Sequence, residues 1–226
     1  MYTNTLDFII ENSSQDDYNI TVHSWDVNGI MGGGDQYGGG VDVAAGKKAR
    51  CSIDIENSLL DFADIDNISD INVIFWAYKD YFKEWSTELI TIKTNLYNES
   101  DKVNVESEPI YSDEVVDVWY LGAEDDNTFV FAVKNKSQYN ATCTFENCSV
   151  NEWTYELDDY SLEAYNEPIN KNAILAVYFP VDAEYLEENG IDRIDTIEFD
   201  ILLDDDNWDY ESNLWTYTTK KINCKL

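Results

Sequence analysis

The chain has 226 residues, of which 44% are hydrophobic and 14% aromatic, and its 46 acidic and 14 basic residues give a formal net charge of -32. This composition excludes a disordered acidic tail, which would be poor in aromatic residues, and the negative field disfavours binding to DNA, RNA or an anionic membrane. No apolar stretch reaches the roughly 20 residues that span a bilayer, so we expect no direct membrane insertion.

Alternation of apolar and polar residues predicts half-buried β-strands along the whole chain. Leu6, Phe8 and Ile10, for example, alternate with Asp7 and Ile9. In the first half, the alternation predicts strands near residues 5–11, 18–25, 49–55, 70–78 and 87–94. In the second half, it predicts strands near residues 113–121, 127–134, 139–147, 172–179, 194–203 and 213–219. The sequence therefore indicates an all-β fold.

One short helical turn is predicted in each half. In the second half, Asp182 can cap a helix over residues 183–188, and Gly190 can supply the left-handed residue that ends it. The counterpart in the first half is a turn over residues 58–63. A single turn across the end of a β-sandwich fits both positions.

The two halves of the chain repeat one another. Residues 4–12 return as 127–135, and residues 18–21 return as 139–142. Ile74 and Trp76 return as Ile197 and Phe199, with the same spacing along the chain as the first of these pairs of segments. The unit is too long for a solenoid repeat of about 20–50 residues, so each copy can bury a core of its own. We predict a first repeat at residues 1–97, a linker at 98–107 and a second repeat at 108–226. The first repeat begins almost directly at the repeated segment, without the extra leading strand that the second repeat has near 113–121: either that strand is missing from this sequence or the first domain does without it.

Cysteine and histidine usage argues against a zinc site and against a catalytic nucleophile. Cys51, Cys143, Cys148 and Cys224 follow no zinc spacing, and the sister copy has aliphatic residues opposite Cys51 and Cys143, which is typical of small core side chains. A bridge between Cys143 and Cys148 stays open, although strand geometry disfavours it. His23 is the single histidine, and we expect it to face solvent from a strand, not to act as a base.

Two acidic or glycine-rich segments resemble ligand loops only superficially. The glycines at residues 32–40 lack the strand–loop–helix context of a phosphate loop and favour a flexible connection. The acidic run at 204–209 lacks the mid-loop glycine and closing glutamate of a calcium loop. We therefore expect no cofactor, with Asp204, Asp206 and Asp209 as candidate ligands for an adventitious calcium ion. Carboxylate pairs are uninformative, because 46 acids produce them by chance.

Clusters of aromatic residues mark the candidate binding contacts. Tyr81, Phe82 and Trp85 fall in one predicted hairpin, and Trp208 and Tyr210 fall in the equivalent hairpin of the second copy. Exposed aromatic rings on a sandwich can stack on sugars or anchor a protein partner. The competing interpretation is that these rings line the core and the strand edges.

Several turn motifs occur together in the chain: E-N-S-S at residues 11–14, V-A-A-G-K-K-A at 43–49, S-V-N at 149–151, L-E-E-N-G-I at 186–191 and D-D-D-N-W-D at 204–209. This combination resembles the repeated β-sandwich domain of Gram-positive bacterial surface lipoproteins. It is also similar to the extracellular part of membrane proteins that carry an N-terminal zinc ribbon. The resemblance implies an immunoglobulin-like fold and a surface location, and it brings no activity with it. The glycine-rich loop and the missing leading strand depart from the family's pattern.

Together, these features predict two tandem immunoglobulin-like β-sandwich domains, each with one short helical turn. We expect a non-catalytic, acidic module, extracellular or at the cell surface, whose export signal lies outside this sequence and whose partner is an unidentified protein or glycan. The alternative is a charge-based interaction protein that mimics nucleic acid to occupy a basic target. A carboxylate-dependent glycosidase or a calcium-binding module is the third interpretation.

Overall fold

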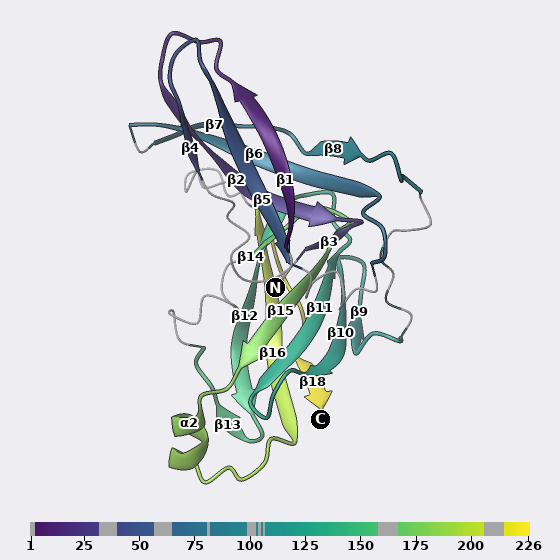
Figure 1. The fold of residues 1–226 in the computed structure, drawn as a ribbon. Helices are drawn as coiled ribbons and strands as arrows, with labels where there is room; N and C mark the ends of the chain where they lie inside the picture. The colour runs from purple at the N-terminus through teal and green to yellow at the C-terminus, as the bar shows by residue number, and fades with distance from the viewer. Residues whose placement is uncertain are drawn as a thin grey trace. The chain divides into compact units, whose positions relative to one another are not determined.

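A computed structural model shows β-strands throughout the described part of the chain, with one short helix, which confirms the predicted all-β fold class (Figure 1). It describes residues 3–31, 40–56, 65–80, 82–98, 103, 105, 107–157, 167–205 and 215–226. These residues divide into two compact units, the first up to Val103 and the second from Val105 onward. Among the described residues, no helix is long and apolar enough to cross a membrane.

The first unit contains two sheets. In one, β1 (Thr3–Glu11) pairs antiparallel with β5 (Lys48–Glu56). The other is centred on the antiparallel pair β2 (Tyr18–Val27) and β6 (Asp70–Lys79). Shorter strands extend this second sheet: β3 (Ile30–Met31) and β4 (Val41–Val43) pair with β2, and β7 (Phe82–Ser86) and β8 (Ile90–Lys93) pair with β6.

The second unit also contains two sheets. The first runs in the order β9 (Tyr111–Ser112), β10 (Val116–Ala123), β11 (Thr128–Asn135) and β15 (Ile174–Pro180). The second is centred on β12 (Ala141–Val150) and β16 (Thr196–Asp205). Its shorter members are β13 (Trp153–Thr154) and β14 (Glu167–Ile169) on β12, and β17 (Thr216–Thr218) and β18 (Ile222–Lys225) on β16.

The helix α2 (Ala183–Glu188) lies where the capping residues predict it. The side chain of Asp182 accepts a hydrogen bond from the backbone N–H of Glu184 at 2.8 Å. Gly190 adopts a φ of +64° just after the helix, a conformation that side chains with a Cβ rarely adopt. The turn predicted at residues 58–63 lies outside the described residues.

Four phenylalanines form the centre of the second unit. Phe131 and Phe179 come from one sheet, and Phe145 and Phe199 come from the other. The ring centroids of Phe131 and Phe199 are 4.9 Å apart, and those of Phe145 and Phe179 are 5.4 Å apart, each pair meeting edge to face. The two sheets of this unit therefore pack against one another through interdigitated aromatic rings, which is the arrangement of a sandwich.

The same strand pairing recurs in both units. The pairs β1–β5, β2–β4 and β2–β6 of the first unit correspond to β11–β15, β12–β14 and β12–β16 of the second. In the same way, β7 and β8 pair with β6 as β17 and β18 pair with β16. The sequence repeat therefore corresponds to a repeat of topology.

Matching side-chain hydrogen bonds fix the correspondence between the copies. Asn12 donates to the carbonyls of Asp16 and Val43, and Asn135 donates to those of Tyr139 and Ile169. Both asparagines also accept a hydrogen bond from the serine two residues later. The first strands of the two copies therefore align as the sequence indicates.

The register of the later strands differs from the sequence alignment. The hydroxyl of Thr87 accepts from the backbone N–H of Phe75 at 3.0 Å, and the hydroxyl of Thr219 accepts from that of Ile201 at 2.9 Å. Phe75 of the first unit therefore corresponds to Ile201 of the second. Four residues earlier on the same strands, Ile71 corresponds to Ile197. The sequence matched Ile197 to Ile74, a slip of three residues. Repeated isoleucines caused this error, because they satisfy more than one register.

The cysteines are core residues, and the predicted exposure of His23 is wrong. Cys51, Cys143, Cys148 and Cys224 are buried thiols without a disulfide. Burial raises the pKa of Cys148 to about 12 and that of Cys224 to about 11, so these thiols stay protonated and unreactive near neutral pH. His23 is only 2% exposed, and its ring stacks on Trp76 with centroids 3.5 Å apart. It lies where β2 slips its register against β6, so the simple alternation of faces fails there.

Candidate functional site

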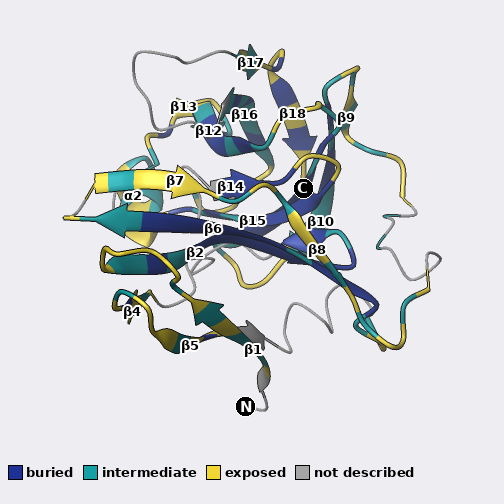
Figure 2. Cartoon of the chain, turned by 90° about the horizontal axis from the view of Figure 1, so that it is seen from above, coloured by how far each residue is buried: buried dark blue, intermediate teal, exposed yellow. Residues whose placement is uncertain are grey.

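Two aromatic side chains on β7 are unusually exposed. Phe82 is 76% exposed and Trp85 is 45% exposed, and Figure 2 shows β7 as a largely exposed strand beside the buried β6. Phe82 lies opposite Lys79, and Trp85 lies opposite Ala77, with a register shift between the two pairs. Because paired residues project to the same face of a sheet, the shift brings both rings to one face.

Tyr18 completes this aromatic group. Its ring lies 6.4 Å from that of Trp85, and its hydroxyl donates a hydrogen bond to Glu84 Oε2 at 3.0 Å. That hydrogen bond is the main cause of the raised pKa of Tyr18. We call Tyr18, Phe82, Glu84 and Trp85 the β7 surface. Tyr18 packs edge-on against Trp85 and is held by its hydrogen bond to Glu84, while Phe82 and Trp85 stay exposed.

A cavity of about 980 Å³ adjoins the β7 surface. Its lining includes Tyr18, Tyr78 and Lys79, together with the carboxylates of Asp17 and Asp42. Asp42 accepts a hydrogen bond from the Asn19 amide at 3.0 Å, and Asp17 accepts one from the backbone N–H of Ala45 at 2.7 Å. The site thus combines aromatic faces with fixed hydrogen-bond acceptors, a combination suited to a ligand that has both apolar faces and hydroxyl groups.

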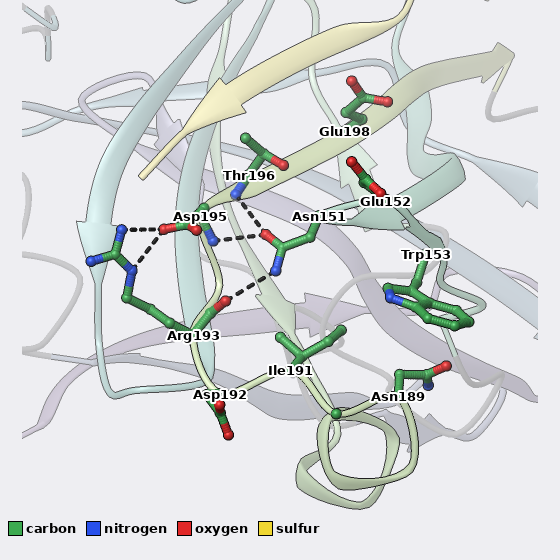
Figure 3. Close-up of a pocket in the computed structure, with 11 residues that line it drawn as sticks. Asn151, Glu152, Trp153, Asn189, Ile191, Asp192, Arg193, Asp195, Thr196 and Glu198 are labelled. Carbon is green, nitrogen blue, oxygen red and sulfur yellow. Dashed lines mark hydrogen bonds and ion pairs between the residues drawn. The ribbon is translucent and has the colours of Figure 1, made fainter.

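A second cavity, of about 590 Å³, lies in the second unit (Figure 3). It is formed where the turn between β12 and β13 meets the loop that follows α2. Trp153 lies at one side, near Asn189, and is 51% exposed, whereas the Arg193 side chain extends away from Trp153 toward Asp195. The Arg193 guanidinium donates from Nε to Asp195 Oδ1 at 2.7 Å.

Asn151, on the wall of this second cavity, has a structural role. Its Oδ1 accepts from the backbone N–H groups of Asp195 and Thr196, and its Nδ2 donates to the Arg193 carbonyl at 3.0 Å. Asn28 makes the matching contacts in the first unit, to Ser69, Asp70 and Asn67. Because both units contain this asparagine turn, its role is to hold the fold together. Trp153 is therefore the feature that is particular to this cavity. Two of the turn motifs noted in the sequence, at 149–151 and 186–191, meet here.

The structure describes only part of the candidate residues named from the sequence. Phe82 and Trp85 lie together and exposed, whereas Tyr81, Trp208, Tyr210, Asp206 and Asp209 lie outside the described residues. Asp204 is on β16, and its Oδ1 accepts a hydrogen bond from the Thr216 hydroxyl at 2.8 Å. Within the described ranges, no group of three histidine, cysteine, aspartate or glutamate side chains is placed to hold a metal ion.

Sequence reasoning missed a polar cluster around Asp113. The hydroxyls of Tyr111 and Tyr217 both donate to Asp113 Oδ2, and the backbone N–H groups of Val115 and Val116 donate to Oδ1 at 2.7 and 2.9 Å. Burial would raise the pKa of Asp113, but these hydrogen bonds outweigh it and lower the pKa to about 2. The carboxylate is saturated with donors, so it links strands and is not available as a general acid or base.

Comparisons with known proteins leave the chain without an assigned family. No family model matches it, and no curated protein is significantly similar to it. Among solved structures, the chain is similar to a protein of unknown function from Porphyromonas gingivalis, with 12% sequence identity and a TM-score of 0.25 over 100% of this chain and 92% of that one. A similarity this weak carries no information about function, so only the geometry of the described surfaces bears on it.

Proposed function

We propose that this chain is a non-catalytic binding module of a cell surface, made of two tandem immunoglobulin-like β-sandwich domains, whose β7 surface binds a glycan. The observation that carries the proposal is the pair of exposed rings on β7, Phe82 at 76% and Trp85 at 45% exposure, beside a cavity lined by carboxylates, amides and hydroxyls. Exposed rings are costly to leave in water unless they meet a partner, and sugar rings offer apolar C–H faces to stack on them.

The polar lining supports a glycan over a nucleic acid. Sugar hydroxyls can donate to the carboxylates of Asp17 and Asp42, which are held in position by Ala45 and Asn19. A phosphate backbone would instead meet like charge in these groups and in the net charge of -32. The turn motifs that resemble those of Gram-positive surface lipoproteins support the proposed surface location and the immunoglobulin-like fold.

Glycan titration of matched variants tests this proposal. Purified cell-wall and mucin-type polysaccharides would be titrated calorimetrically into the unmodified chain, Trp85→Ala, Phe82→Ala and Trp153→Ala. Trp85→Ala should weaken binding by about tenfold or more through the lost stacking. Trp153→Ala removes an equally exposed tryptophan elsewhere and should leave the affinity unchanged. Equal affinity of the Trp85→Ala and unmodified chains for every bound glycan would refute the assignment.

The salt dependence of binding distinguishes the charge-based alternative from the glycan-binding module. A chain that mimics nucleic acid binds basic proteins through its acidic surface, so the affinity for such a target should fall steeply between low and high salt. Stacking on Trp85 depends little on ionic strength. Binding to a histone-type basic protein that survives Trp85→Ala and collapses in salt would favour the mimic and count against the glycan module.

A further inference from the structure

The cavity beside the β7 surface is acidic. Its described lining contains three aspartates, Asp17, Asp42 and Asp80, and one basic residue, Lys79. The Lys79 ammonium forms an ion pair at 3.1 Å with Asp16, and this contact is the main cause of its raised pKa. Because Asp16 already offsets the charge of Lys79, the three lining aspartates keep their negative charges without a basic side chain of the lining to neutralise them.

Two of these carboxylates are fixed in place and still have a free oxygen. Asp17 accepts a hydrogen bond from the backbone N–H of Ala45 through Oδ1, and Asp42 accepts one from the Asn19 amide through Oδ1. Within the described part of the chain, the Oδ2 atom of each has no hydrogen-bond partner. A carboxylate that is held by one oxygen can present the other to a ligand with little further loss of side-chain freedom.

The second unit shows that the fold does not need the charge of Asp17. Asn140 occupies the corresponding place, and its Oδ1 accepts from the backbone N–H of Lys171 at 3.0 Å, as Asp17 accepts from that of Ala45 at 2.7 Å. A neutral amide therefore makes the same turn contact. The negative charge at Asp17 is an addition of the first unit, at the edge of its cavity.

The arrangement of the charges favours an organic cation over a metal ion. A calcium or magnesium ion needs several oxygen atoms that converge within about 2.0–2.6 Å of one point. Among the described residues, no three acidic, histidine or cysteine side chains converge in this way. The cavity of about 980 Å³ instead has the size of a pocket for a larger organic molecule, whose separate polar groups can meet separate carboxylates.

Building on the glycan site proposed above, we infer that its ligand is a cationic glycan, whose sugar rings carry protonated amino groups. Tyr18 joins the two parts of the site, since it packs against Trp85 and also lines the cavity. Sugar rings stack on the exposed rings of the β7 surface, while ammonium groups donate charge-assisted hydrogen bonds to Asp17 and Asp42. The net charge of -32 attracts such a ligand and repels glycans that carry carboxylate or sulfate groups.

Two tetrasaccharides separate the effect of the amine from that of the sugar ring: β-1,4-linked glucosamine and its fully N-acetylated form. At a pH of about 6, an amine with a pKa near that of an α-amino group, about 8, is protonated. Calorimetric titration there should show that the amine form binds about tenfold more tightly or better. At a pH of about 9 the difference should disappear, because the amine is then neutral. Equal affinities at the lower pH would overturn the inference.

Variants of the aspartates locate the charge that selects the ligand. Asp17→Asn keeps the turn contact, as Asn140 shows, and Asp42→Asn keeps an acceptor for the Asn19 amide. Each should weaken binding of the amine tetrasaccharide by about fivefold and leave that of the N-acetylated form unchanged. Asp192→Asn, at an exposed aspartate of the second unit, should alter neither affinity. An equal loss in Asp192→Asn would mean that the net charge, not the cavity, attracts the amine.

Trp85→Ala separates failure of this inference from failure of the glycan site. It should weaken both tetrasaccharides through the lost stacking. If it weakens both but neither is preferred, the glycan site stands and the cationic ligand is wrong; if it weakens neither, the glycan site itself is wrong. A capped lysine tetrapeptide should bind more weakly than the amine tetrasaccharide, because it has no ring to stack on Trp85. Equally tight peptide binding that Asp17→Asn reduces would assign the cavity to a basic peptide and refute the glycan.

Discussion

Asp113 joins the leading strands of the second unit to its last hairpin, and the pH dependence of stability should reveal it. Its pKa in the folded chain, about 2, lies below the usual 3.8. Ionised Asp113 therefore stabilises the fold above a pH of about 4, and this contribution is lost as the pH falls toward about 2. Asp113 is partly exposed, so we expect Asp113→Asn to lower the free energy of unfolding by only about 1–2 kcal/mol near pH 7.

Urea unfolding of Asp113→Asn, of the unmodified chain and of Glu114→Gln, a change at the exposed neighbouring residue, measures this effect. The deficit of Asp113→Asn should shrink as the pH is lowered toward about 2, because the unmodified chain then loses the same charge. A deficit that is constant with pH would mean that packing, not the ionised carboxylate, holds Tyr111 and Tyr217.

Single residues also show which parts of the candidate site could be predicted from the sequence and which could not. Phe82 and Trp85 were identified as candidate contacts from their clustering, and both are exposed. Trp76, only nine residues before Trp85, is 7% exposed, and nothing in its local sequence separates the two. The exposure of an aromatic side chain depends on what packs over the strand, which is a tertiary property. The Asp113 cluster was missed for the same reason, since Tyr217 lies 104 residues away.

At the scale of elements, alternation located the long strands and missed most of the short ones. Strands such as β1, β2 and β11 have enough residues for a period of two to stand out. The strands β3, β4, β9, β13, β14, β17 and β18 have two to four residues each, and most carry no readable period. The strand predicted near 87–94 corresponds to the shorter β8, at Ile90–Lys93, whereas β7, at Phe82–Ser86, was not predicted as a strand.

Among the connections between elements, we expect the turns that contain Asn28 and Asn151 to be those where a substitution lowers the stability most. Asn28 is 1% exposed, has a φ of 52° and accepts hydrogen bonds from the backbone N–H groups of Ser69 and Asp70. Asn28→Ala leaves these donors unsatisfied and places alanine in the left-handed region. We expect it to lower the free energy of unfolding by about 2–4 kcal/mol.

Asn151 allows a matched comparison, because it makes the same contacts with a φ of 55° but is less buried. Asn151→Ala should cost less, about 1–2 kcal/mol, since water can reach the released N–H groups. Chemical denaturation followed by tryptophan fluorescence would measure both variants. If Asn151→Ala proved as costly as Asn28→Ala, burial would not be what sets the energy of this turn.

At the scale of the whole molecule, the repeated topology stabilises each unit, whereas the acidic charge destabilises the folded chain through self-repulsion. The repeated topology gives each unit its own sheets and turn devices, and the net charge of -32 makes every folded surface repel its neighbours. Repulsion of this kind is screened over a Debye length of about 10 Å at 0.1 M salt. The repeat is visible in the sequence, whereas the register that relates the later strands of the two copies became clear only from the hydrogen bonds of the structure.

The melting temperature of the chain should therefore rise with sodium chloride, by about 2–8 °C between low and moderate salt, as acidic self-repulsion is screened. The same measurement tests the calcium hypothesis. If calcium acts only by screening, calcium and magnesium at equal ionic strength will shift the melting temperature equally. A rise specific to calcium that a chelator reverses, and that Asp204→Asn reduces, would instead establish a calcium site at 204–209. The Thr216 hydroxyl bonded to Asp204 favours screening, because a calcium ligand there would have to exchange that contact.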